Sequence, residues 1–329
     1  WWRPAASTMA ASTGGVERMR IDSSGNVGIG TTTPGAKLDV STGNINLDDT
    51  TNVNQFGVIS KNGIRFIHNF NYGNNGTVTT EGKNIFIGKN AGNLTMGSTA
   101  TQTSQASRNI AIGENAFITN TTGFQNVAIG SSALFLNSSG WDNVAIGTNA
   151  LTANTSGFNN NAYGTFSLSS NTTGYDNSAI GHESLKLNTT GYDNTGVGYS
   201  AIRSNTTGSG NTAVGINALY SNIGGSNNTV NGKNAMYSNT TGYRNTVDGY
   251  AALQSNTSGY ENLAQGYQAG RYIFDGTTAN QTSNTSLYLG ANSKALANGD
   301  TNEIVIGNDA TGLGSNTVVL GNSSVITTA

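Results

Sequence analysis

The stretch NVAIGTNALTANTSGFN, residues 143–159, decides the fold, because the chain repeats its pattern every 17 residues. Each unit has an asparagine, a glycine four residues later, a second asparagine seven residues after that, and a second glycine three residues further on. The first glycine recurs without a slip at positions 113, 130, 147, 164, 181, 198, 215, 232, 249 and 266. A strict period of this kind indicates a repeat architecture in which each unit stacks on the next.

One unit can be interpreted by counting its positions from the first glycine as zero. Position −2 is small and mostly alanine, and positions −3 and −1 are often Val and Ile, so residues −3 to 0 predict a short strand. Ala and Leu at +3 and +4 predict a second short strand, and the Asn-Thr-Thr-Gly that follows predicts a turn. The Gly and Asn content disfavours helices. We therefore predict an all-β fold, a parallel β-solenoid of 17-residue coils stacked about 4.8 Å apart, with the asparagines in amide ladders.

The outward face of such a coil predicts an oligomer. If the small residues at −2 and 0 fill a thin interior, the residues at −3 and −1 must point outward. An exposed aliphatic row invites aggregation unless a partner covers it, and a closed trimer would bury it. The residues expected at this trimer seam are Ile112, Val127, Ile129, Val144 and Ile146. Later units carry Asn231, Asp248 and Gln265 at −1, so we expect the seam to become polar there.

The chain divides by pattern into four segments. Residues 1–50 predict an N-terminal β segment, with strands at Arg18–Asp22 and Asn26–Ile29 around a Ser24-Gly25 turn and a third strand at Lys37–Val40. Residues 51–83 predict a β connector, 84–270 the solenoid (regular from 109), and 271–329 irregular coils. The start, Trp1-Trp2-Arg3, has neither Met nor a signal-peptide pattern, so we expect a fragment or a processed product.

Composition argues against several classes of function. A net charge of −2 argues against nucleic acid as a partner, and the lack of any apolar run near 18 residues argues against membrane insertion. There is no cysteine, and His68 and His182 are far apart, so we expect no metal site and no His-based catalysis. The GxGxxA match at Gly196 is simply the repeat, so no cofactor is expected.

An aromatic residue at position +11 is the candidate binding feature. The first five are Phe124, Trp141, Phe158, Tyr175 and Tyr192; Ser209 and Ser226 interrupt the row, and Tyr243 and Tyr260 resume it. One hypothesis is a structural ladder in which each ring covers its neighbour; the other is a glycan-binding strip formed by those first five rings. Position +12 beside it is often acidic or amide and could bind sugar hydroxyls, a cation or water.

Three stretches resemble known fibre proteins. MRIDSSGNVGIGTTTPGAKLDV (Met19–Val40) resembles a segment that recurs in bacteriophage tail fibres. NEIVIGNDATGLGSNTVVLGNSSV (Asn302–Val325) resembles the stretch that precedes the cleaved, trimerising C-terminal chaperone domain of those fibres. The central NxAxG units resemble the head repeats of trimeric autotransporter adhesins, which form left-handed β-rolls with a period of roughly 14 rather than 17.

The resemblance implies a structural fibre protein rather than an enzyme. We expect the trimeric shaft of a phage-like tail fibre, extracellular in the virion, whose partners are its own copies, other virion tail proteins and a host-surface glycan. The alternative is a trimeric adhesin or extracellular filament subunit on a bacterial surface. A polysaccharide-cleaving enzyme is not favoured, because Asp176 and Asp193 should stack along a ladder instead of forming an acid/base pair.

Overall fold

The computed structural model describes residues 7–41, 44–51, 53 and 57–325, so Trp1–Arg3 lie outside the described residues. The chain splits into two compact units, Trp1–Asp48 and Asp49–Ala329. Every regular element of the described ranges is a β-strand, which confirms the all-β prediction. Residues 57–83 lie in the same unit as the repeats.

The first unit is a four-stranded sheet in the order β1-β2-β3-β4. Its strands are β1 (Met9–Thr13), β2 (Val16–Ile21), β3 (Val27–Ile29) and β4 (Leu38–Val40). The first two pairings are antiparallel and β3 pairs with β4 in parallel. The backbone N–H groups of Ser24 and Asn26 donate to Asp22 Oδ1 at 2.8 and 2.9 Å, which fixes the β2–β3 turn. The three predicted strands are confirmed, whereas β1 had no alternating pattern that would reveal it.

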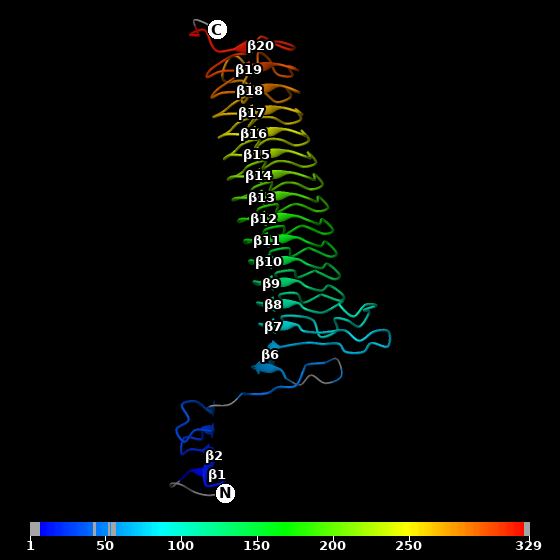
Figure 1. Cartoon of the computed structure of the whole chain (residues 1–329), viewed down its shortest axis with the longest axis vertical. Helices are drawn as coiled ribbons and strands as arrows, with labels where there is room; N and C mark the ends of the chain where they lie inside the picture. Colours follow the sequence, from blue (N-terminus) through cyan, green and yellow to red (C-terminus); the bar gives the residue numbers. More distant parts are fainter. Residues whose placement is uncertain (1–6, 42–43, 52, 54–56, 326–329) are drawn as a thin grey trace. The chain divides into compact units, whose positions relative to one another are not determined.

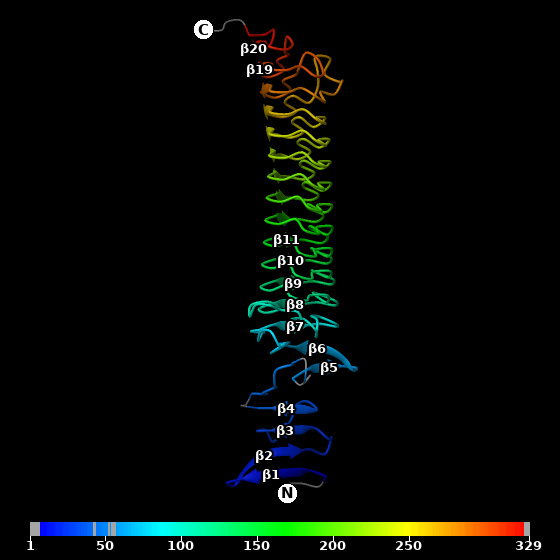
Figure 2. The same cartoon turned by 90° about the vertical axis from the view of Figure 1, so that its right-hand side faces the viewer.

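The second unit is one 16-stranded sheet in which strands follow one another in chain order from β5 to β20 (Figures 1 and 2). An antiparallel hairpin, β5 (Ile59–Lys61) and β6 (Ile64–His68), pairs with β7 (Ile85–Ile87), and all later pairings are parallel. The later strands are β8 (Ile110–Ile112), β9 (Val127–Ile129), β10 (Val144–Ile146), β11 (Asn161–Tyr163), β12 (Ser178–Ile180), β13 (Thr195–Val197), β14 (Thr212–Val214), β15 (Thr229–Asn231), β16 (Thr246–Asp248), β17 (Leu263–Gln265), β18 (Leu287–Leu289), β19 (Ile304–Ile306) and β20 (Val318–Leu320).

The register of these strands confirms the predicted solenoid. Ala128 pairs with Ala145, and Ala145 with Ala162, so equivalent positions of successive 17-residue coils lie side by side. The step from β19 to β20 shortens to 14 residues, with Ile304 opposite Val318. Parallel strands in register bring identical residues into rows along the solenoid.

The interior is filled by positions −2, +3 and +4 of each coil. In one coil these are Ala128, Ala133 and Leu134, all fully buried. Small residues on the strand and one larger residue on the opposite side suit a thin coil. The inward direction of position −2 is therefore confirmed.

The predicted second strand at +3 and +4 is wrong. Residues 131–136 form turns, and Ser132 and Leu134 have φ angles of 55° and 49°. Leu134 N–H still donates to Ala150 O of the next coil at 3.0 Å. Left-handed angles at non-glycine residues cost about 1–3 kcal/mol each, and burial of the Leu side chain, worth about 1.5–3 kcal/mol, offsets that cost.

Two ladders of buried asparagine run through the solenoid, as the repeats predict. At position +7, Asn154 Nδ2 donates to Asn137 Oδ1 of the preceding coil at 2.7 Å and to Gly157 O of its own coil at 3.0 Å. At position −4, Asn143 Nδ2 donates to the same Gly157 O at 2.9 Å. The second glycine of each unit therefore joins the two ladders through its carbonyl.

The first glycine of each unit is required by its backbone. Gly130 has a φ of +136°, a region that is open almost only to glycine. A Cβ there would lie 2.5 Å from the carbonyl oxygen of Gly147. The unbroken glycine row follows from this close stacking of backbones.

Candidate functional site

The rings at position +11 stack face to face along the solenoid. From Phe124 through Trp141, Phe158 and Tyr175 to Tyr192, successive ring centroids are 5.8, 4.6, 4.9 and 4.9 Å apart. The angles between successive ring planes are 5°, 4°, 6° and 4°. The structure thus brings together all five residues of the predicted strip in a single row.

This stacking decides which ring surfaces meet the solvent. Each inner ring, such as Trp141, has a neighbour against both flat faces and is half-buried. A pyranose packs its C–H face on the flat face of an aromatic ring, whereas the inner rings of this row present mainly their edges. The geometry accordingly favours the structural ladder for the inner rings.

The rings beside the interruption are more open. Tyr192 is 42% exposed and Tyr243 is 39% exposed. Among the described rings, Tyr192 stacks only on Tyr175, and Tyr243 only on Tyr260, at 5.0 Å. The expected strip ends at Tyr192, before Ser209 and Ser226, and does not include Tyr243, although the break in the row of rings is visible in the sequence.

Polar side chains at position +12 accompany the ring row. Asp193, Asn227 and Arg244 are exposed, and Gly210 leaves one coil without a side chain. Arg244 Nη1 pairs with Glu261 Oε1 at 2.9 Å, and its guanidinium carbon lies 5.7 Å from the Tyr243 ring centroid. Carboxylate, amide and guanidinium groups all form the hydrogen bonds that sugar hydroxyls need.

The predicted seam residues lie on the outer face of the sheet. Ile112, Val127, Ile129 and Val144 are half-buried, and Ile146 is 37% exposed. They stand in register on β8, β9 and β10, so they form one aliphatic strip. We call the outward residues of β7–β10 at positions −3 and −1 the aliphatic strip.

The same face changes character along the solenoid. On β15–β17 position −1 is Asn231, Asp248 and Gln265, and Asn231 Nδ2 donates to Asp248 Oδ1 at 2.9 Å. On β18–β20 the outward residues are aliphatic again, with Leu289 37% exposed. Position −1 is therefore polar on β15–β17, which we call the polar segment, and aliphatic on β8–β10 and β18–β20.

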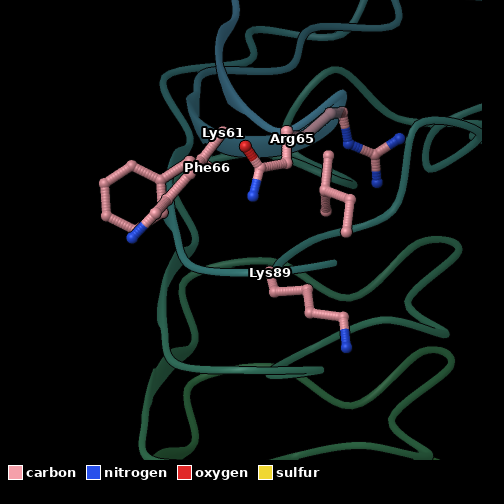
Figure 3. Close-up of a pocket in the computed structure, with 6 residues that line it drawn as sticks. Lys61, Arg65, Phe66 and Lys89 are labelled. Carbon is pink, nitrogen blue, oxygen red and sulfur yellow. The ribbon is translucent and has the colours of Figure 1, made fainter.

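A pocket of about 280 Å³ lies at the β5–β6 hairpin. Lys61, Arg65 and Phe66 line it from the hairpin and Lys89 from the residues after β7, together with Asn62 and Ile64 (Figure 3). Burial lowers the pKa of Arg65, and Lys89 Nζ pairs with Glu114 Oε1 at 2.9 Å. The cationic lining suits an anion, but the side chains shown do not converge on one point (Figure 3).

Two carboxylates have shifted pKa values for opposite reasons. Hydrogen bonds from Lys186 and Arg203, at 2.6 and 2.8 Å, lower the pKa of Glu183 to about 2. Burial raises the pKa of Glu303, which accepts hydrogen bonds from the backbone N–H groups of Gly314 and Leu296. Both groups are held by structural contacts.

The described residues contain no group of three or more His, Cys, Asp or Glu side chains placed to hold a metal ion. His68 is buried, with Nε2 3.0 Å from Ala91 O, whereas His182 stacks on Tyr199 in a distant coil. No helix among the described residues has the length and apolar character to cross a bilayer. No protein-family model, curated protein or solved structure matches this chain.

Proposed function

We propose that this chain is the shaft of a homotrimeric extracellular fibre of the phage tail-fibre type. In that role it joins other virion tail proteins and contacts glycan on the host surface. The resemblance of Met19–Val40 and Asn302–Val325 to tail-fibre segments supports this assignment. A solenoid stabilised by contacts between neighbouring coils can be extended without a large globular core, as a shaft requires.

The observation that carries the trimer is the aliphatic strip. Ile110, Ile112, Val127 and Ile129 stand outward side by side on β8 and β9, and Ile85 on β7 is 51% exposed. A contiguous apolar row on a monomeric protein is uncommon and indicates a surface that a partner covers. A second copy related by rotation carries the same strip, so a closed ring of copies buries every strip.

The polar segment at β15–β17 supports a seam that varies along its length. On β8–β10 the seam positions hold Val and Ile. On β15 and β16 the same positions hold side chains that can form hydrogen bonds to a neighbouring chain: Thr229, Asn231 and Thr246. Polar groups within an otherwise apolar seam fix the register of the copies, because a slipped pairing would leave them without partners.

The test is the mass of the full chain in solution by multi-angle light scattering at micromolar concentration. We expect the mass of three chains, and a stable species of single-chain mass would overturn the trimer. Antibody labelling then decides the location: label on purified virion tails supports the fibre, whereas label on bacterial cells without phage supports the adhesin or filament.

A further inference from the structure

The interruption of the ring row is built by two serines whose side chains turn back on the backbone. Ser209 Oγ accepts from the Tyr192 backbone N–H at 3.1 Å, and Ser226 Oγ accepts from the Ser209 backbone N–H at 3.1 Å. Each serine replaces a ring that would otherwise continue the row. Two consecutive coils therefore carry no position +11 ring between Tyr192 and Tyr243.

This leaves two flat ring faces that no described ring covers, at opposite ends of one interval. Tyr175 covers the other face of Tyr192, and Tyr260 covers the other face of Tyr243. Tyr192 and Tyr243 stand three coils apart, about 14 Å at ordinary strand spacing. The distance between the two rings is thus about three times the spacing of stacked rings in the row, so more than one sugar ring fits between them.

The surroundings of the interval are polar. Asp193 and Asn227 are exposed at position +12, and the serine hydroxyls and Gly210 lie between the two rings along the chain. The Arg244 guanidinium borders the Tyr243 ring, 5.7 Å from its centroid, while it pairs with Glu261 of the following coil. Apolar faces beside planar hydrogen-bonding groups match a sugar, which has C–H faces and a rim of hydroxyls. A hydrophobic peptide would cover the Asp193 carboxylate and the Asn227 amide without offering them hydrogen bonds, which costs binding energy.

We propose that the interval between Tyr192 and Tyr243 binds a short neutral oligosaccharide. One pyranose packs on Tyr192 and another on Tyr243, and Asp193, Asn227 and Arg244 bind the hydroxyls. This site deepens the proposed attachment function and rests on it. It places the contact at the break in the ladder rather than along the continuous rings from Phe124 to Tyr175.

The experiment screens the full chain on an array of neutral oligosaccharides and titrates the strongest binder by calorimetry. Tyr192→Ala and Tyr243→Ala should each weaken binding at least tenfold. Phe158→Ala is the matched control, because that ring is covered on both faces by Trp141 and Tyr175 and does not stack on Tyr192. The melting temperature of each variant is measured alongside to separate lost binding from lost folding.

A second variant fills the interval. Ser209→Tyr combined with Ser226→Tyr continues the row, as at Tyr175 and Tyr192, and should abolish binding without lowering the melting temperature. The proposal is overturned if no neutral oligosaccharide binds, if Phe158→Ala weakens binding as much as Tyr192→Ala, or if the filled variant binds like the unchanged chain. Light-scattering mass tests the shaft separately, since a single-chain mass with intact glycan binding would overturn only the trimer.

Discussion

Asn143 donates twice to one atom of Asn126: its backbone N–H and its side-chain Nδ2 both lie 3.0 Å from Asn126 Oδ1. Both residues are fully buried, one coil apart. Each asparagine thereby satisfies the backbone as well as the side chain of the next coil, and aligned hydrogen bonds of this kind strengthen one another.

Asn126→Ala should therefore be costly. It leaves the buried backbone N–H of Asn143 without an acceptor, at about 1–3 kcal/mol, and removes one of the two hydrogen bonds that Asn143 Nδ2 donates, the one to Gly157 O remaining. We expect the denaturant midpoint to fall, whereas Ser139→Ala, at an exposed turn position nearby, should change it little. Equal midpoints for the two variants would contradict the role of the ladder.

Gly130→Ala tests the close approach of the coils. The φ of +136° is strained for alanine by about 1–3 kcal/mol, and the new Cβ must push Gly147 O away. The free energy of unfolding should fall by more than the strain alone, with Ser131→Ala as the exposed control. A stability equal to that of the control would show that the coils can separate there at no cost.

Ile129→Asp tests the proposed seam. A carboxylate without a partner in a desolvated interface costs several kcal/mol, and each chain of the trimer would add one. We expect the mass to fall from three chains to one, while Ser131→Asp, which is exposed, keeps three. A trimer that tolerates Ile129→Asp would place the interface elsewhere.

Glu303→Gln should alter the pH dependence of stability. Burial raises the pKa of Glu303 above 4.5 in the folded chain, so the folded state holds the proton more tightly than the unfolded state. Its contribution is present at low pH and is lost as pH rises from about 4.5 through the folded pKa. The glutamine amide keeps an oxygen for Gly314 N–H and stays neutral. The variant should therefore have a higher melting temperature than the unchanged chain near pH 7, and its melting temperature should not fall as pH rises through the folded pKa of Glu303.

The control for that measurement is Asp309→Asn, because Asp309 is exposed. Melting temperature is recorded from pH 4 to 8 for all three chains. If the unchanged chain and the Glu303 variant run parallel, Glu303 ionises in the folded state as readily as in the unfolded state.

Trp141→Ala separates stacking from recognition. Loss of its contacts with Phe124 and Phe158 removes two ring pairs, worth about 1–3 kcal/mol together. The melting temperature should fall and glycan binding should remain, and Trp141→Phe should restore most of the stability. If glycan binding is lost and the melting temperature is unchanged, the glycan site lies on the continuous rings from Phe124 to Tyr192 instead.

The repeat made the register, the inward alanines and the asparagine ladders predictable, because identical residues at one spacing can only stack. The turn at 131–136 was not predictable in the same way. Leu134 has little intrinsic preference for a left-handed φ, and its angle follows from the hydrogen bond to Ala150 and from burial of its side chain. Contacts between coils overrode the local preference.

The ring row shows a different limit. Its positions follow from the period, but the direction of the ring planes depends on side-chain torsions that a sequence does not specify. The structure supplies that direction: successive rings from Phe124 to Tyr192 stack face to face, so the inner rings cover one another. Glu303 shows another limit: it stands four residues before Gly307, the place of the asparagine in each unit, but only the structure shows that this carboxyl group is fully buried.

The 17-residue register also fixes how the length of the solenoid depends on the number of units. Because Val127, Val144 and Asn161 pair in one row, removing or adding a whole unit leaves every row intact and changes the length by one strand spacing, about 4.8 Å. Other spacings also occur in this chain: the 14-residue step from β19 to β20 keeps the strands paired in a shorter coil, and the 24-residue step from β17 to β18 adds residues between paired strands. The reach of such a shaft can therefore be set in fixed steps by the number of units alone, with no change to its cross-section.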